Sequence, residues 1–415
     1  GLGLRGSRSI DVSRQLRLLL AADFAMRLAG IACYTLFIAA IYNTTGKASD
    51  IGFISAVTAL PALLMALSAA KYTQRFSAAS SVRYLLLARA VIFASAAALP
   101  VGTVAILVVA GLHSLLNQAA VSAKMSLDAE LLDDENRRKY NSSKTMLVNV
   151  AVIVGPPFGG VVVQSLGYRV ALLIMAAITL LVPLALLAVR QPDVELEAEQ
   201  AAVSTTPAAS LRYLRTVPYV AAIISLYCLV AVILEVEAPL MFPFVDEIYH
   251  RGSGFTGLLL GLAGIGGICG AILAQRLPDL FSESSIPWLI MLDGLAFLVF
   301  TQLRAQLPAA AVFALLGVMG AVTLVVVEGT VQQHVVKTHR PFVFSGMQFA
   351  SGAGGASLGI ATAFLAQAYG AKLVLAVCAI AELLAGGGCV TAAFYFRSRE
   401  RRQPRGIPAA QRMES

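Results

Sequence analysis

Long apolar segments separated by short polar stretches run along almost the whole chain. Each segment has the length that a helix needs to cross a bilayer, ~20 residues, and ionisable residues are rare inside them. The pattern predicts an all-α polytopic membrane protein with twelve transmembrane helices. The predicted spans are 16–42, 50–72, 82–99, 102–126, 141–164, 169–189, 217–245, 254–276, 285–303, 308–333, 343–367 and 371–396.

One long polar stretch, Arg190 to Arg215, interrupts this pattern with three glutamates and a Ser/Thr/Pro patch. It divides the spans into two sets of six, as in transporters with duplicated halves. The predicted organisation is an N-terminal six-helix bundle over 1–189, a cytoplasmic linker over 190–216, a C-terminal six-helix bundle over 217–397 and a basic cytoplasmic tail over 398–415.

Positive charges predict the orientation of the spans. With both termini inside, 24 of the 31 Lys and Arg residues face the cytoplasm, and Arg27 and Arg89 lie within spans. Such a bias favours cytoplasmic termini and an even number of spans in the inner (cytoplasmic) membrane. It also explains the net charge of +8 without nucleic-acid binding. The outer loops receive only Lys47, Arg169, Arg251, Arg304 and Lys372.

Composition excludes several classes of function. Hydrophobic residues make up 58% of the chain and charged residues 13%, about half the charged fraction of a soluble domain. No catalytic domain, nucleophile–base constellation or phosphate-binding GxxxxGK[ST] loop is present, so we expect neither an enzyme nor ATP drive. The five cysteines lie in apolar stretches without CxxC spacing, and we expect no metal site.

Three sequence stretches carry a family resemblance. They are Thr45-Gly46-Lys47 through Leu60-Pro61; Leu127 to Leu132 with Asp134-Glu135 and Tyr140-Asn141; and Gly155-Pro156 to Gly159-Gly160 followed by Gly167. With them the chain resembles the major facilitator superfamily, and within it the branch of enterobactin-type siderophore exporters and macrolide or drug efflux pumps. The resemblance implies a monomeric major facilitator fold whose first, fourth, seventh and tenth spans line a central cavity.

The chain also departs from the family pattern. In the loop between spans two and three, Ala70 and Gln74 stand where the family usually has Gly and Asp, and only Arg75 remains. Ala151 stands at the leading Gly of the antiporter motif. A Gln-Arg pair recurs at the end of span eight. The resemblance and this repeat together imply gating or structural roles for Gln74, Arg75, Gly155, Pro156, Gly159, Gly160, Gln275 and Arg276.

Ionisable residues inside spans are the candidate functional groups. A charge in hydrocarbon costs at least ~2.5–3.5 kcal/mol, so it usually faces water or a partner. In the spans that the resemblance places around the cavity, the proton-coupling candidates are Glu328, Glu235, Asp23 and His113. The substrate-cavity candidates are Arg27, Asn117, Gln118, Glu237 and Gln332.

Each candidate has a structural alternative. Asp23 and Arg27 share a helix face and could form an internal ion pair, and His113 could be a packing residue instead of a titrating one. Glu235 and Glu237 are two residues apart and point in different directions, so we expect only one to face the cavity.

Other charges and the glycines of the spans are expected to act structurally. We interpret Arg89, Asp293 and Glu382 as interhelical partners, and Lys124 as a charge reaching out to the cytoplasmic interface. Glycines four residues apart in spans eight and eleven predict close helix contacts.

The combined pattern predicts a secondary-active transporter. The leading hypothesis is proton-coupled export of a small amphipathic organic molecule, either a drug-like compound or a siderophore. The drive is the proton gradient, with no cofactor, and the partners are the substrate, protons and the lipid bilayer. The alternatives are import of a metal chelate or other small solute by the same fold and, less favoured, a non-transporting membrane sensor.

Overall fold

The computed structural model describes residues 3–59, 78–131, 134–187, 215–277, 279–336 and 340–402, and these residues form helices joined by short connections. Gln74, Arg75, most of the predicted linker and the end of the predicted tail lie outside the described residues. The elements are α1 (Gly3–Thr45), a helix over Ala48–Ala59, α3 (Ala78–Ala98), α4 (Thr103–Leu131), α5 (Asp134–Leu187), α7 (Pro218–Tyr249), α8 (Ser253–Arg276), η1 (Glu283–Ser285), α9 (Ile286–Gln302), α10 (Gln306–His334), α11 (Arg340–Tyr369) and α12 (Ala371–Arg402).

The helices match the predicted spans closely. Ten segments of the described chain are long and apolar enough to cross a membrane. One of them, Met146–Leu187, covers 42 residues and contains most of the predicted spans 141–164 and 169–189. These two spans meet at Gly167, whose φ of 78° and ψ of 168° interrupt the helix. The second predicted span begins in the helix Ala48–Ala59 and continues outside the described residues, so the count of twelve remains a prediction.

Large apolar side chains cover the outside of the helices. Val104 is 74% exposed, Leu184 59% and Leu384 68%. A surface of this kind is unfavourable in water and is expected where a protein meets lipid. The chain is therefore a multi-pass membrane protein.

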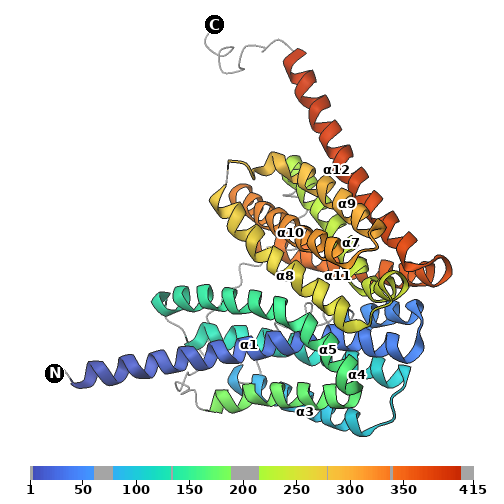
Figure 1. The fold of residues 1–415 in the computed structure, drawn as a ribbon. Coiled ribbons are helices and arrows are strands. Elements are labelled where there is room, and N and C mark those ends of the chain that lie inside the picture. Colours follow the sequence, from blue (N-terminus) through green and yellow to red (C-terminus); the bar gives the residue numbers. More distant parts are fainter. Residues whose placement is uncertain are drawn as a thin grey trace.

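The helices form two groups (Figure 1). One group contains α1, α3, α4 and α5, and the other contains α7 to α12. Helix α5 packs against α8, and α1 also reaches α7. The groups diverge toward the end of the molecule where α1 begins. We call them the N-terminal and C-terminal bundles.

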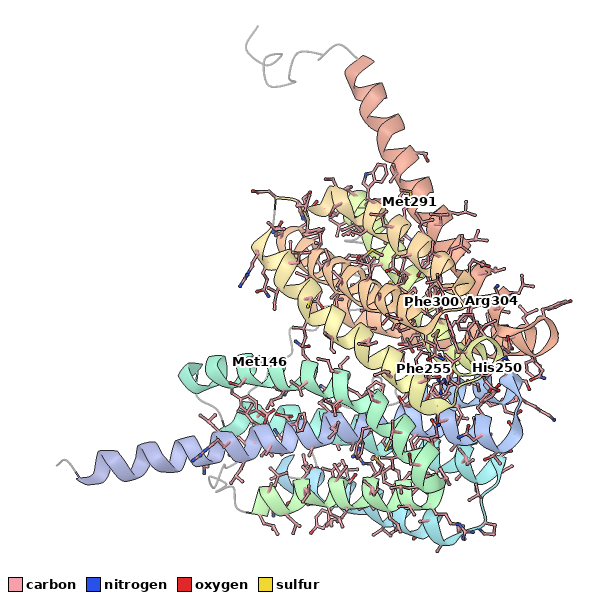
Figure 2. All side chains as sticks on the ribbon, in the orientation of Figure 1. Met146, His250, Phe255, Met291, Phe300 and Arg304 are labelled. Carbon is pink, nitrogen blue, oxygen red and sulfur yellow. The ribbon has the colours of Figure 1, made fainter. Side chains whose placement is uncertain are left out.

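Tight turns gather at the end where the bundles meet. Gly46, Gly167 and Gly370 each have positive φ, a backbone conformation that glycine adopts without steric cost. Gly46 and Gly370 directly follow α1 and α11, as helix-ending glycines often do. Figure 2 shows His250, Phe255 and Arg304 at this end and Met146 of α5 toward the other. The turn at 250–252 and Arg304 are two of the predicted outer connections.

The membrane orientation itself is a testable prediction. Single cysteines at Lys47 and Lys372, in a background without native cysteines, should react with an impermeant thiol reagent added outside intact cells. A cysteine at Arg212, in the predicted linker, should react only after the cells are permeabilised, because the positive-charge bias places it inside. Labelling of the Arg212 position from outside would contradict cytoplasmic termini.

Candidate transport site

The contact between the bundles is built on the Gly155–Gly160 segment of α5. Gly155 and Gly159 lie against α1: a Cβ at Gly159 would come within 2.3 Å of the Ala32 carbonyl oxygen. Gly160 lies against α8, where a Cβ would come within 2.4 Å of the Ser253 carbonyl oxygen. These glycines therefore allow α5 to pack closely on its own bundle and on the opposite bundle at once.

Helix α8 meets this segment with glycines of its own. A Cβ at Gly257 would lie 2.5 Å from the Pro156 carbonyl oxygen, and one at Gly261 would lie 2.6 Å from Pro157 Cγ. The predicted close contact at Gly257-x-x-x-Gly261 is therefore confirmed, with α5 as the partner. The Gly266-x-x-x-Gly270 pair packs on α10 within the C-terminal bundle.

Hydrogen bonds hold the same contact together. Ser253 Oγ donates to the Gly160 carbonyl at 3.1 Å, and Gly254 N–H donates to Gln164 Oε1 at 2.6 Å. Nearby, Tyr42 of α1 donates to Asp246 of α7 at 3.0 Å. We call the packing of α5 153–164 against α8 253–264 the bundle contact. It is closely packed, with hydrogen bonds where α8 begins.

A buried ionic cluster lies at the opposite end of the N-terminal bundle. Lys124 Nζ lies 3.2 Å from Asp23 Oδ2 and also donates to Asp128. Lys144 Nζ lies 3.1 Å from Asp128 Oδ2 and 3.7 Å from Asp23 Oδ1. Tyr140 donates to Asp23 and lies 2.9 Å from Lys124 Nζ. Two carboxylates and two ammonium groups balance, so the cluster is electrically neutral.

The cluster corrects two expectations. Lys124 is only 1% exposed, so it does not reach out to the interface. The ion pairs of Asp23 go to Lys124 and Lys144 instead of Arg27, and this cross-linking of α1, α4 and α5 outweighs the local helix-face pairing. Burial, followed by the charges of Asp23 and Asp128, raises the pKa of Tyr140, which keeps its hydroxyl a donor.

A second polar group lies in the middle of the N-terminal bundle. Arg89 is fully buried and donates to Asn117 Oδ1 at 2.7 Å and to Thr179 Oγ1 at 3.0 Å. No carboxylate pairs with it among the described residues. The predicted interhelical role of Arg89 is confirmed, with neutral partners. Asn117 is partly exposed beside Gly30 of α1, so its amide connects this core to the edge of the bundle.

His113 belongs to the aromatic core of that bundle. Its ring stacks on Phe93 with centroids 5.5 Å apart and lies 5.6 Å from Phe37. It is 5% exposed. Asp23 and His113 are thus buried in separate places, and the expectation that they share one cavity with Glu328 is wrong: helix periodicity does not reveal which face a single polar residue joins.

The two glutamates of α7 point in different directions, as expected. Glu235 is exposed, packs on Gly355 of α11 and interacts electrostatically with Tyr34 of α1. Glu235 therefore faces the region between the bundles. Glu237 is 6% exposed and faces Asp293 and Glu382 inside the C-terminal bundle. Glu328 is exposed on α10 and interacts with Tyr227 of α7.

The remaining candidates occupy varied positions. Arg27 lines a small pocket with Asp23, Lys124 and Lys144. Gln118 is partly buried, Gln275 and Arg276 are exposed at the end of α8, and Gln332 lies in α10, with its side chain outside the described atoms.

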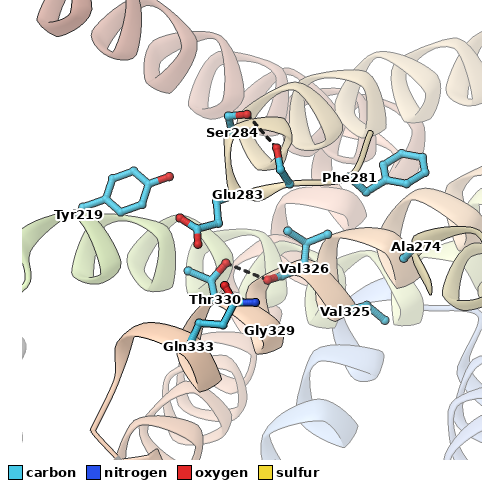
Figure 3. A pocket seen from close by; sticks show the side chains of 11 residues that line it. Tyr219, Ala274, Phe281, Glu283, Ser284, Val325, Val326, Gly329, Thr330 and Gln333 are labelled. Atoms are coloured by element: carbon cyan, nitrogen blue, oxygen red, sulfur yellow. Dashed lines mark hydrogen bonds between the residues drawn. The ribbon is translucent and has the colours of Figure 1, made fainter. Parts of the chain in front are cut away.

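A larger pocket of about 550 Å³ lies beside the end of α10 (Figure 3). Tyr219 of α7, Glu283 of η1 and Thr330 of α10 contribute its polar groups, and Phe281 and Val326 contribute apolar ones. It lies near the last turns of α8 and α10, at the end where the bundles diverge. All residues that line it belong to the C-terminal bundle.

Two bundles of apolar helices that meet at one end and carry ionisable groups inside are typical of secondary transporters. Residues 20–301 match the Major Facilitator Superfamily, and the chain belongs to that family. No curated protein matches it.

Solved transporter structures share the fold. A point mutant of the nucleoside transporter NupG is similar with a TM-score of 0.72 and 14% identity, covering 90% of this chain and 98% of its own. A bacterial homolog of the human lysosomal transporter Spinster, inward-facing and unoccupied, gives 0.72 and 15%, covering 95% and 99%. A peptide transporter POT in complex with sulfate gives 0.70 and 13%, covering 92% and 94%.

Sequence reasoning missed most of the ionic cluster. The sequence analysis names Asp128 and Tyr140 only as part of the family resemblance, and it does not single out Lys144. The sequence signal that could have predicted part of the cluster is the spacing of Lys124 and Asp128, which are four residues apart and so can pair on one helix face. No local signal connects either residue to Asp23, about a hundred positions earlier.

Proposed function

We propose that the chain is a proton-coupled exporter of a small amphipathic organic molecule, working by alternating access. The observation that carries the proposal is the arrangement of the bundles, which touch along α5 and α8 at one end and diverge at the other. With the termini inside, this state faces the cytoplasm. Rocking of the bundles around the contact exposes the site to the other side.

The charges of the C-terminal bundle support protons as the coupling ion. The carboxylates Glu235, Glu237, Asp293 and Glu382 lie well inside three of its six apolar spans, and Glu328 lies three positions from the end of a fourth. The only Lys or Arg residues of these spans are Arg276 and Lys372, each within two positions of a span end. A carboxylate in a low-dielectric bundle without a fixed cation nearby is more stable with a bound proton than in its ionised form.

The sequence resemblance supports export as the direction and a small organic molecule as the substrate. The Gly155–Gly160 segment, which resembles the antiporter motif of drug exporters, lies at the moving contact between the bundles. The similar structures are named for nucleosides and peptides, which are organic solutes of modest size. We place the chain with drug and siderophore exporters, as a monomer in the inner membrane that needs no cofactor.

The experiment is transport in proteoliposomes with an imposed pH gradient. Ethidium and a catecholate siderophore serve as probes, and the matched control is liposomes without protein. We expect movement of at least one probe against its gradient, out of the compartment equivalent to the cytoplasm, and its loss when an uncoupler is added. Probe movement in the same direction as protons would indicate import, and equal transport without a gradient would contradict proton coupling.

Glu235→Gln is expected to abolish gradient-driven transport while probe exchange at equal pH survives. The carboxylate of Glu235 faces the region between the bundles, so its proton can exchange with water when that region opens. Glutamine keeps the size and polarity but cannot ionise. Asp279→Asn, an exposed acid after α8, is the control. Full gradient-driven transport by Glu235→Gln would remove this residue from the coupling pathway.

A further inference from the structure

Three carboxylic side chains converge inside the C-terminal bundle from three helices: Glu237 of α7, Asp293 of α9 and Glu382 of α12. Close packing of α9 on α12 brings them together. A Cβ at Gly294 would lie 2.6 Å from Leu383 N, and one at Gly386 would lie 2.6 Å from Met291 N. We call these three residues the carboxylate trio.

Four of the six carboxylate oxygens of the trio are buried and have no hydrogen-bond donor in the part of the chain that the structure describes. Glu382 is 0% exposed, and neither of its carboxylate oxygens has a hydrogen-bond partner in the described chain. One oxygen each of Glu237 and Asp293 is buried and unpaired in the same way. Asp293 and Glu382 lie side by side, because a Cβ at Gly294, next to Asp293, would come within 2.9 Å of Glu382 Cβ. Two ionised carboxylates have only acceptors, so a hydrogen bond between Asp293 and Glu382 requires a proton on one of them.

No cation balances the trio among the described residues. The other titratable group beside it is Cys378 of α12, which interacts with Glu237 and Glu382. Of the other helices that pack here, α10 contributes Glu328 beside Tyr227 and His334 beside Glu283 at its end, and α11 contributes Tyr369 at its end. This environment contrasts with Asp23, whose charge is balanced by Lys124 and Lys144.

We propose that the carboxylate trio is a proton-binding site, with a proton held between Asp293 and Glu382 and exchanged during the transport cycle. Binding converts one carboxylate to a carboxylic acid, which donates its O–H to the neighbouring carboxylate. Release returns the proton to water and leaves like charges in contact, a state that burial strongly disfavours. No metal is needed, and no group of metal-ligand geometry occurs in the described chain.

Helix α7 connects this site to transport. Glu235 faces the region between the bundles, whereas Glu237, two residues later, faces Asp293 and Glu382 as a member of the trio. A rotation or bend of α7, which contains Pro239 and Pro243, therefore changes both environments together. The coupling role rests on the proposed function, but proton binding by the trio does not.

Infrared difference spectroscopy of the full-length protein in nanodiscs tests proton binding without any substrate. The readout is the C=O stretch of a protonated carboxyl group, followed during pH titration in H2O and D2O. We expect this band in the unmodified protein at neutral pH. Glu382→Gln and Asp293→Asn should each remove the component of this band that the trio contributes, whereas Asp279→Asn should leave the band unchanged. The amides supply the missing N–H donor, so these variants preserve the contact and the fold.

The outcomes separate the two proposals. Absence of the band at neutral pH, or a band of unchanged intensity in both variants, overturns proton binding by the trio. Displacement of the band by sodium at constant pH also overturns it in favour of a metal cation. If the band depends on the trio but probe transport is the same with and without a pH gradient, the proton-binding site is supported and proton-coupled transport is rejected. Loss of gradient-driven transport in Glu382→Gln, with exchange retained, upholds both.

Discussion

Lys124→Ala is expected to lower the free energy of unfolding by about 3–5 kcal/mol, the cost of leaving one partner of a buried ion pair alone. Lys124 is 1% exposed and contacts Asp23, Asp128 and Tyr140 on three helices. Its removal leaves two buried carboxylates with only Lys144 to balance them. The measurement is unfolding of the purified protein in mixed detergent micelles of increasing SDS content.

Lys144→Ala is the matched control for this prediction. It removes the same charge from the same cluster, but its side chain is 20% exposed, so water can take its place and we expect a smaller loss. Lys124→Met combined with Asp128→Leu should recover part of the stability, because it removes both partners and fills the space. Unfolding of Lys124→Ala at the same SDS content as the unmodified protein would show that the cluster does not hold the bundle together.

The positions of the helices could be predicted from the sequence because hydropathy and charge act locally. Every long helix of the described chain coincides with a predicted span, and the break at Gly167 falls in the predicted outer connection between spans five and six. The different directions of Glu235 and Glu237 also follow from helix geometry alone, since two residues correspond to about 200° of rotation.

The partners of polar residues could not be predicted in the same way. Whether Asp23 meets Arg27 or Lys124 depends on how α1 packs against α4, and nothing along the chain encodes that crossing. Asp293 and Glu382 are expected from the sequence to have interhelical partners, and they do, but each partner is another acid. Their meeting depends on the glycines that bring α9 and α12 together.

Gly257→Ala is expected to shift the protein away from the state in which the bundles touch along α5 and α8. The new Cβ would lie 2.5 Å from the Pro156 carbonyl oxygen and 3.0 Å from Pro157 Cα, and backbone atoms in a helix cannot move aside easily. Overpacking of this kind costs about 1–3 kcal/mol. The cost applies only where the helices are in contact, so the state in which they separate at that end gains population.

Distances between spin labels report this shift. One pair, at Lys47 and Arg304, spans the end where the bundles meet, and another, at Met146 and Arg276, spans the end where they diverge; all four side chains are exposed. In Gly257→Ala the first distance should lengthen and the second should shorten. Gly320→Ala in α10 is the control, because its Cβ would meet no atom within 4 Å. If Gly257→Ala and Gly320→Ala give the same two distances, the α5–α8 contact does not control the opening of the bundles.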